Sequence, residues 1–117
     1  LSMNIYGGTA DLAVYSASKA ALAIATKSAA HAHRFDRMRV NGINLGWAET
    51  PAEHQMQAVT LKRGAAWRDE AAAKLPFGRL IQPDDVARLA TFLLSDASLP
   101  MTGALIDQGQ WVIGPRD

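Results

Sequence analysis

A tyrosine and a lysine stand four positions apart in the stretch VYSASKAAL, at Tyr15 and Lys19. Positions i and i+4 share one face of a helix, so this spacing predicts that the phenol and the ammonium lie within a few ångströms of each other. A tyrosine is ordinarily a poor proton donor or acceptor at neutral pH, whereas a neighbouring positive charge favours its phenolate form. Such a pair can act as a general acid–base group. The opposing interpretation of the pair alone is a tyrosine at a helix start with an exposed lysine extending past it.

The surrounding elements alternate between helical and extended patterns. Residues 12–36 are rich in alanine and free of glycine and proline, which predicts a long helix. The β-branched stretch 39–45 predicts a strand, and residues 103–107 predict a second one. Between them, a helical pattern from residue 53 to about 75 is broken by Gly64, which indicates two short helices. A further helix begins near Pro83, with two aspartates in its first turn and one apolar face.

This order of elements predicts an α/β fold of the doubly wound class. Helix, strand, helix and strand in succession imply crossover connections and a parallel sheet that is covered on both faces. Residues 1–11 indicate the end of a strand followed by a loop with Gly7 and Gly8. Because so few strands are present, we expect the missing ones to precede Leu1.

Composition excludes several classes of function. The chain has 117 residues, 49% of them hydrophobic, which is enough for a core. Twelve basic and eleven acidic residues are interspersed, so we expect neither a nucleic-acid nor a membrane-surface partner. The absence of cysteine excludes disulfides and thiol catalysis. Residues 1–30 lack a signal-peptide pattern, and the expected location is cytoplasmic.

Several motifs resemble one enzyme family in order along the chain. Ser2 lies 13 residues before Tyr15, and a strand-end serine, a glycine loop and Tyr-x-x-x-Lys on a helix resemble the short-chain dehydrogenase/reductase family. RVNGINLGWAETP resembles the family's V-N-x-I-x-P-G-x-x-x-T pattern, and GRLIQPDDVARLATFLLSDASLPMTG resembles its late helix. ALIDQGQ resembles its V-D-G-G ending. The resemblance covers nearly the whole chain and is to the compact, single-domain branch.

The sequence also departs from the family pattern at several positions. Leu45 stands where the family has proline, and Asp107-Gln108-Gly109 replaces Asp-Gly-Gly. The family's glycine-rich turn for the dinucleotide pyrophosphate belongs before Leu1. Residues 1–117 are therefore interpreted as the C-terminal part of one Rossmann-like domain, with the catalytic helix, a substrate-covering segment at about 51–78 and the last strand. Without the N-terminal half, we expect no tight dinucleotide binding.

The resemblance implies an NAD- or NADP-dependent oxidoreductase that interconverts an alcohol and a carbonyl. Tyr15 would exchange a proton with the substrate oxygen, Lys19 would favour its phenolate and bond the nicotinamide ribose, and Ser2 would donate to that oxygen. The cofactor-binding residues implied are Tyr15, Lys19, Gly46, Trp47, Ala48 and Thr50. As alternatives to these roles, Ser2 is an ordinary turn serine and Thr50 only caps the following helix.

The remaining candidates concern the pocket and the assembly. Trp47 and Met56, with Trp67 nearby, either line the substrate pocket or are core or interface residues. The implied assembly is a homodimer or homotetramer, and a second helix could approach a stripe of small residues at positions 21, 25, 29 and 32. The apolar tail at 111–114 is a second candidate contact.

The histidines and the remaining glutamates do not indicate a catalytic or metal-binding role. His31 and His33 point to different faces of a helix and leave His54 without a partner, so we expect no metal site. Glu49, Glu53 and Glu70 are interpreted as solvated charges. Two rival functions stay open: the same scaffold as a non-catalytic binding or regulatory protein, and a sugar-nucleotide epimerase or dehydratase, which shares Tyr-x-x-x-Lys. A glycine-rich turn before Leu1 would argue against the first rival, and the compact pattern after Thr50 argues against the second.

Overall fold

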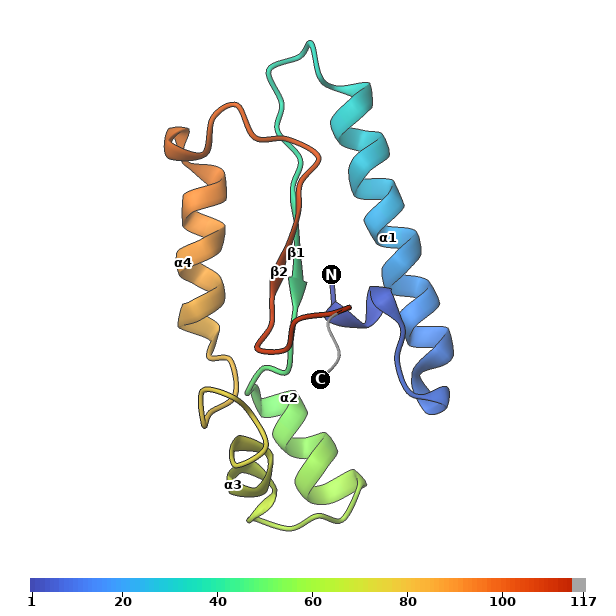
Figure 1. The fold of residues 1–117 in the computed structure, drawn as a ribbon, viewed down its shortest axis with the longest axis vertical. Helices are drawn as coiled ribbons and strands as arrows, with labels where there is room; N and C mark the ends of the chain where they lie inside the picture. Colours follow the sequence, from blue (N-terminus) through green and yellow to red (C-terminus); the bar gives the residue numbers. More distant parts are fainter. Residues whose placement is uncertain (115–117) are drawn as a thin grey trace.

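The computed structural model describes residues 1–114 and shows two parallel strands between two long helices (Figure 1). Strand β1 (Gly42–Leu45) pairs with β2 (Leu105–Gln108), in a register that runs from Gly42 opposite Leu105 to Leu45 opposite Gln108. The predicted parallel α/β arrangement is confirmed. Within residues 1–114 the sheet contains only these two strands.

Helix α1 (Ala13–Ala32) is shorter than the predicted 12–36, because its last predicted turn becomes a tight turn. The His33 N–H donates to the Ala29 carbonyl, the His33 ring bonds the Asp36 carboxylate at 2.9 Å, and Arg37 is left-handed with φ 57°. The first of these is the last regular helical bond, and the side-chain bond and the left-handed residue end the helix after it.

Two short 3-10 turns precede α1: η1 (Met3–Tyr6) and η2 (Ala10–Leu12). Ser2 has the extended backbone of a strand residue, with φ −150° and ψ 148°. The glycine loop follows, and Gly7 takes φ 122°, which a residue with a side chain rarely adopts.

Strand β1 begins at Gly42 rather than at residue 39. Side chains replace the backbone ladder just before it: the Val40 N–H donates to the Thr102 hydroxyl, and Asn41 bonds both Met101 and Ala104. These bonds satisfy the backbone without regular pairing.

The segment between β1 and α4 consists of helix α2 (Pro51–His54), the π-helical segment η3 (Gln55–Thr60) and helix α3 (Trp67–Ala72). The predicted break at Gly64 is confirmed, with φ 70° at that residue. Trp67, Ala71 and Leu80 form a buried cluster beneath these helices. This cluster fixes the segment to the end of the sheet.

Helix α4 (Pro83–Leu94) begins as its sequence predicts. Pro83 occupies the first turn, and the Asp85 carboxylate accepts the Gln82 N–H at 2.9 Å in a capping box. A short 3-10 turn, η4 (Asp96–Ser98), follows α4. In Figure 1, α4 and α1 lie on either side of the strand pair. None of the helices among the described residues has the length and apolar character needed to cross a membrane.

Candidate active site

The structure brings Tyr15 and Lys19 together near the start of α1. The Lys19 Nζ lies 5.4 Å from the centroid of the Tyr15 ring. Tyr15 is 43% exposed, so its phenol is accessible to a ligand, and Lys19 is half-buried. The spacing therefore produces the predicted juxtaposition, and the acid–base role of Tyr15 stays a prediction.

Ser2 is held in a defined orientation by the turn that it begins. Its Oγ accepts the Asn4 N–H at 3.2 Å, and the residue is only 8% exposed. Because that bond uses a lone pair of the oxygen, the hydroxyl hydrogen stays available for donation. Turn η1 packs against α1, and the loop behind it approaches so closely that a Cβ on Gly8 would lie 2.9 Å from the Ser16 Oγ. Ser2 and the first turns of α1 thus belong to one packed unit.

The loop after β1 is held by backbone bonds to residue 81. The Ile81 N–H donates to the Trp47 carbonyl at 3.0 Å, and the Glu49 N–H donates to the Ile81 carbonyl at 2.8 Å. Gly46 packs against the end of β2, where a Cβ would lie 2.9 Å from the Gly109 Cα. Thr50 caps α2, accepting the Glu53 N–H at 3.1 Å. Thr50 is therefore the N-cap of α2, and its contact with a cofactor stays a prediction.

These pieces are arranged around the carboxyl ends of the two strands. In Figure 1 β1 and β2 end near the middle of the molecule, with α2 and α3 below them and the start of α1 to their lower right. Ligands of open α/β sheets bind at the carboxyl ends of the strands. Ser2, Tyr15, Lys19 and the loop 46–50 stay the candidate residues for such a site.

The two tryptophans near this end differ in their surroundings. Trp67 is 1% exposed and is a core residue, and its indole N–H donates to the His54 Nδ1 at 2.9 Å. Trp47 is half-buried against the same cluster, with its ring centroid 6.4 Å from that of Trp67. Met56, the other pocket candidate, is exposed on the π-helical segment.

Two glutamates are not the solvated charges that the sequence suggested. Glu53 accepts from the Trp47 indole and from the Gln57 amide, both at 2.7 Å. Glu49 pairs with the Arg68 guanidinium at 2.7 Å. The expectation was wrong because the fold brings Trp47 and Arg68 to these glutamates from outside α2, while Gln57 lies one helical turn after Glu53. The one sequence signal for a bonded glutamate was the position of Glu53, three residues after the helix-capping Thr50.

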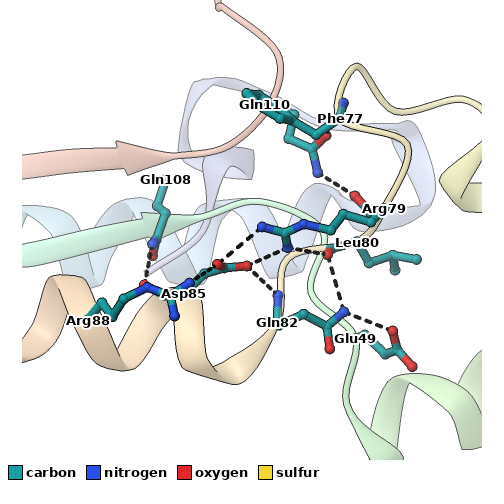
Figure 2. A network of polar contacts seen from close by, with 9 residues as sticks. All are labelled: Glu49, Phe77, Arg79, Leu80, Gln82, Asp85, Arg88, Gln108 and Gln110. Carbon is teal, nitrogen blue, oxygen red and sulfur yellow. Dashed lines mark hydrogen bonds and ion pairs between the residues drawn. The ribbon is translucent and has the colours of Figure 1, made fainter.

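The sequence also did not reveal the polar network between the start of α4 and the chain after β2 (Figure 2). The Asp85 carboxylate accepts from Arg79 at 2.6 and 3.2 Å, and this guanidinium, followed by the Gln82 N–H, holds the pKa of the Asp85 carboxyl well below its usual range. The Gln110 amide donates to the Arg79 carbonyl at 2.7 Å and accepts the Phe77 N–H at 2.9 Å. This network fixes the segment leading into α4.

The histidines offer no metal-binding arrangement. His33 bonds Asp36, and His54 accepts the Trp67 indole N–H. Across residues 1–114, no three or more His, Cys, Asp or Glu side chains come together in a way that could hold a metal ion.

Parallel strands with a tyrosine–lysine helix at their carboxyl ends define a part of a Rossmann-like α/β fold. A family model described as enoyl-(acyl carrier protein) reductase matches residues 2–109. The chain belongs to the short-chain dehydrogenase/reductase family.

Named relatives are consistent with that membership. Over 99 residues the chain is 37% identical to cis-4-hydroxycyclohexanecarboxylate dehydrogenase of Sinomonas cyclohexanicum, covering 85% of this chain and 37% of that protein. A crystal structure of a short-chain dehydrogenase family protein from Francisella tularensis matches with a TM-score of 0.80 at 30% identity, covering 93% of this chain and 47% of that one. L-Sorbose reductase from Gluconobacter frateurii, complexed with NADPH and L-sorbose, matches with a TM-score of 0.74 at 25% identity, covering 84% and 39%. The chain spans less than half the length of each.

Proposed function

We propose that the full-length protein is a nicotinamide-dependent oxidoreductase that interconverts an alcohol and a carbonyl, with Tyr15 as the general acid–base group. The observation that carries the proposal is the Lys19 ammonium 5.4 Å from the Tyr15 ring, beside the turn that orients Ser2. The dehydrogenase and reductase names of the relatives support the same class of reaction.

Each residue has a role that its chemistry supports. In carbonyl reduction, the Tyr15 phenol gives its proton to the substrate oxygen, and the Ser2 hydroxyl donates a hydrogen bond to the same oxygen. Negative charge grows on that oxygen as the carbonyl is reduced, so these donors stabilise the transition state more than the ground state. The Lys19 ammonium, at its short distance from the ring, stabilises the phenolate that remains. In alcohol oxidation the same proton moves back to Tyr15.

The donor set near Tyr15 fits the nicotinamide half of NAD or NADP. Within residues 1–114 the Lys19 ammonium forms no ion pair, so its N–H donors are open to ribose hydroxyls. The Thr50 hydroxyl and the backbone of Gly46, Trp47 and Ala48 lie in the loop at the carboxyl end of β1. A bound nicotinamide would supply the hydride.

The setting of the reaction is part of the proposal. We infer a small alcohol or carbonyl substrate, with Trp47 and Met56 at the pocket, and a cytoplasmic location. We also infer a homodimer or homotetramer, in which a second helix would approach the stripe of small residues at positions 21, 25, 29 and 32 of α1.

The proposal is tested with Tyr15→Phe in the full-length protein. Removing the phenolic hydroxyl should lower kcat by roughly 10²-fold or more, because proton transfer loses its group, while nicotinamide binding persists. Turnover is followed by nicotinamide absorbance with NADH and NADPH over a panel of alcohols and ketones, and binding by nicotinamide fluorescence.

A charge-matched pair of variants provides the control. Lys19→Met should also lower kcat, whereas Lys27→Met removes the same charge two turns further along α1 and should leave it unchanged. Turnover by Tyr15→Phe at the wild-type rate would disprove the assignment. Nicotinamide binding by the wild type without turnover of any substrate would favour a regulatory protein.

A further inference from the structure

A second polar cluster lies beside the turn that carries Ser2, and we call Tyr6, Asn44 and Asp107 the anchor cluster. The Tyr6 hydroxyl donates to the Asp107 Oδ1 at 3.0 Å. The Asn44 amide donates to the same oxygen at 2.7 Å. One carboxylate oxygen therefore receives a donor from the turn before α1 and a donor from the sheet.

The sheet fixes the position of that carboxylate. Asn44 and Asp107 are direct partners in the β1–β2 register, and Asn44 is completely buried. A buried amide whose donor is bonded cannot reorient without losing that bond, so it holds the acceptor in place. The Asp107 Oδ1 is thus a fixed point on the strand pair.

Turn η1 lies against the end of β2 at both of its own ends. Tyr6, its last residue, bonds Asp107, and the Cγ of Met3, its first, lies 3.1 Å from the position that a Cβ on Gly109 would take. Ser2 immediately precedes the turn, and its orientation depends on the Asn4 N–H inside the turn. Rotation of η1 would move that N–H and with it the Ser2 hydroxyl.

We propose that Tyr6 is a positioning residue for the reaction, and that its bond to Asp107 fixes turn η1 so that the Ser2 hydroxyl points at the substrate oxygen. The inference rests on the proposed function, since it assigns a role through Ser2.

Tyr6 is unsuited to be a second proton donor. The hydrogen bond to Asp107, followed by burial and the charge of that carboxylate, raises the pKa of the Tyr6 phenol above its ordinary value, against a smaller opposing effect from Asn44. The proton therefore stays on the phenol at neutral pH, and the hydroxyl acts as a fixed donor to Asp107.

The test is a double-mutant cycle in the full-length protein. Tyr6→Phe keeps the ring and removes only the hydroxyl, and it should lower kcat by about fivefold to tenfold with KM changed by less than about twofold. Ser2→Ala should lower kcat by about a hundredfold. Because Tyr6 acts through Ser2, adding Tyr6→Phe to Ser2→Ala should cost less than about a further twofold. An additive loss would overturn the inference.

Two further variants separate positioning from general stability. Asp107→Asn keeps an acceptor oxygen and should retain kcat within about threefold. Thr26→Val removes a hydroxyl bonded to the Leu22 carbonyl at 2.9 Å on α1, away from the anchor cluster, and should leave kcat and KM unchanged. A loss in Thr26→Val equal to that in Tyr6→Phe would contradict a specific role.

A readout independent of turnover tests the turn itself. Hydrogen–deuterium exchange of the Asn4 and Gly7 amides should accelerate several-fold in Tyr6→Phe and not in Thr26→Val. Unchanged exchange at these amides would overturn the inference even where the enzyme is active. Turnover that survives Tyr15→Phe would instead disprove the proposed function, and the exchange comparison would still decide whether Tyr6 holds the turn.

Discussion

Truncation of Trp67 should detach the segment that lies over the end of the sheet. Trp67 is 1% exposed and packs with Ala71 and Leu80, while Trp47 and Leu75 lie against the same cluster. Through Trp47 and Leu80, this cluster joins residues 51–78 to the loop after β1 and to the segment that leads into α4. Trp67→Ala would leave a large cavity at its centre.

The expected destabilisation follows from the buried area. Complete burial of a tryptophan removes roughly 150–250 Å² from water. At about 25 cal/mol per Å², this corresponds to roughly 4–6 kcal/mol as an upper bound. Truncations of buried aromatic residues to alanine cost about 3–5 kcal/mol. We therefore expect the free energy of unfolding to fall by about 3–5 kcal/mol in Trp67→Ala. Trp67→Phe, which keeps a ring, should lose about 1–2 kcal/mol.

Urea denaturation of the full-length protein, followed by circular dichroism, measures these changes. Phe35→Ala is the control, because Phe35 is 84% exposed and its truncation should change the free energy of unfolding by less than about 0.5 kcal/mol. KM should rise in Trp67→Phe, since the segment carries Met56 over the proposed pocket. Equal destabilisation by the two alanine variants would refute the assignment of Trp67 to the core.

Two further predictions concern the loop after β1 and the start of α4. Gly46→Ala should destabilise the protein by about 1–3 kcal/mol and weaken nicotinamide binding, because the new Cβ would meet backbone at Gly109 that cannot rotate away; wild-type affinity in a dye-ligand or fluorescence titration would contradict this. Asp85→Asn should lower Tm at neutral pH. Arg79 and the Gln82 N–H depress the folded-state pKa of the Asp85 carboxyl below its ordinary 3.8. The stabilisation is therefore present above about pH 4 and is lost as pH falls through the folded value. The Tm difference between wild type and variant should shrink progressively below pH 4, and a difference at pH 2 as large as that at pH 7 would contradict the ion-pair explanation.

The features that were predictable from sequence depend on neighbours within a few residues. The presence of α1 follows from alanine propensity, the start of α4 from Pro83 and Asp85, and the proximity of Tyr15 and Lys19 from helical spacing. Each of these relations operates within about one helical turn, so residue type and spacing determine it.

The features that were missed depend on distant partners. Tyr6 bonds a residue 101 positions away, and Gln110 bonds Arg79 across 31 positions. Glu53 was predicted to be a solvated charge because its partner, the Trp47 indole, lies on the preceding loop. Sequence spacing does not show where a loop directs its side chains. The start of β1 was predicted too early because the side chain of Asn41 makes the hydrogen bonds that a paired strand would make with its backbone. Strand propensity does not reveal such side-chain bonds.

The separation of the two paired strands has a consequence for synthesis on the ribosome. Asn44 and Asp107 are 63 positions apart, and β1 has no partner among residues 1–114 until β2 has been made. At roughly 5–20 residues per second, translation separates β1 from β2 by about 3–13 seconds, during which the edge of β1 that pairs with β2 has no partner. A nascent chain halted before residue 105 should therefore bind chaperones more strongly than one released after residue 108.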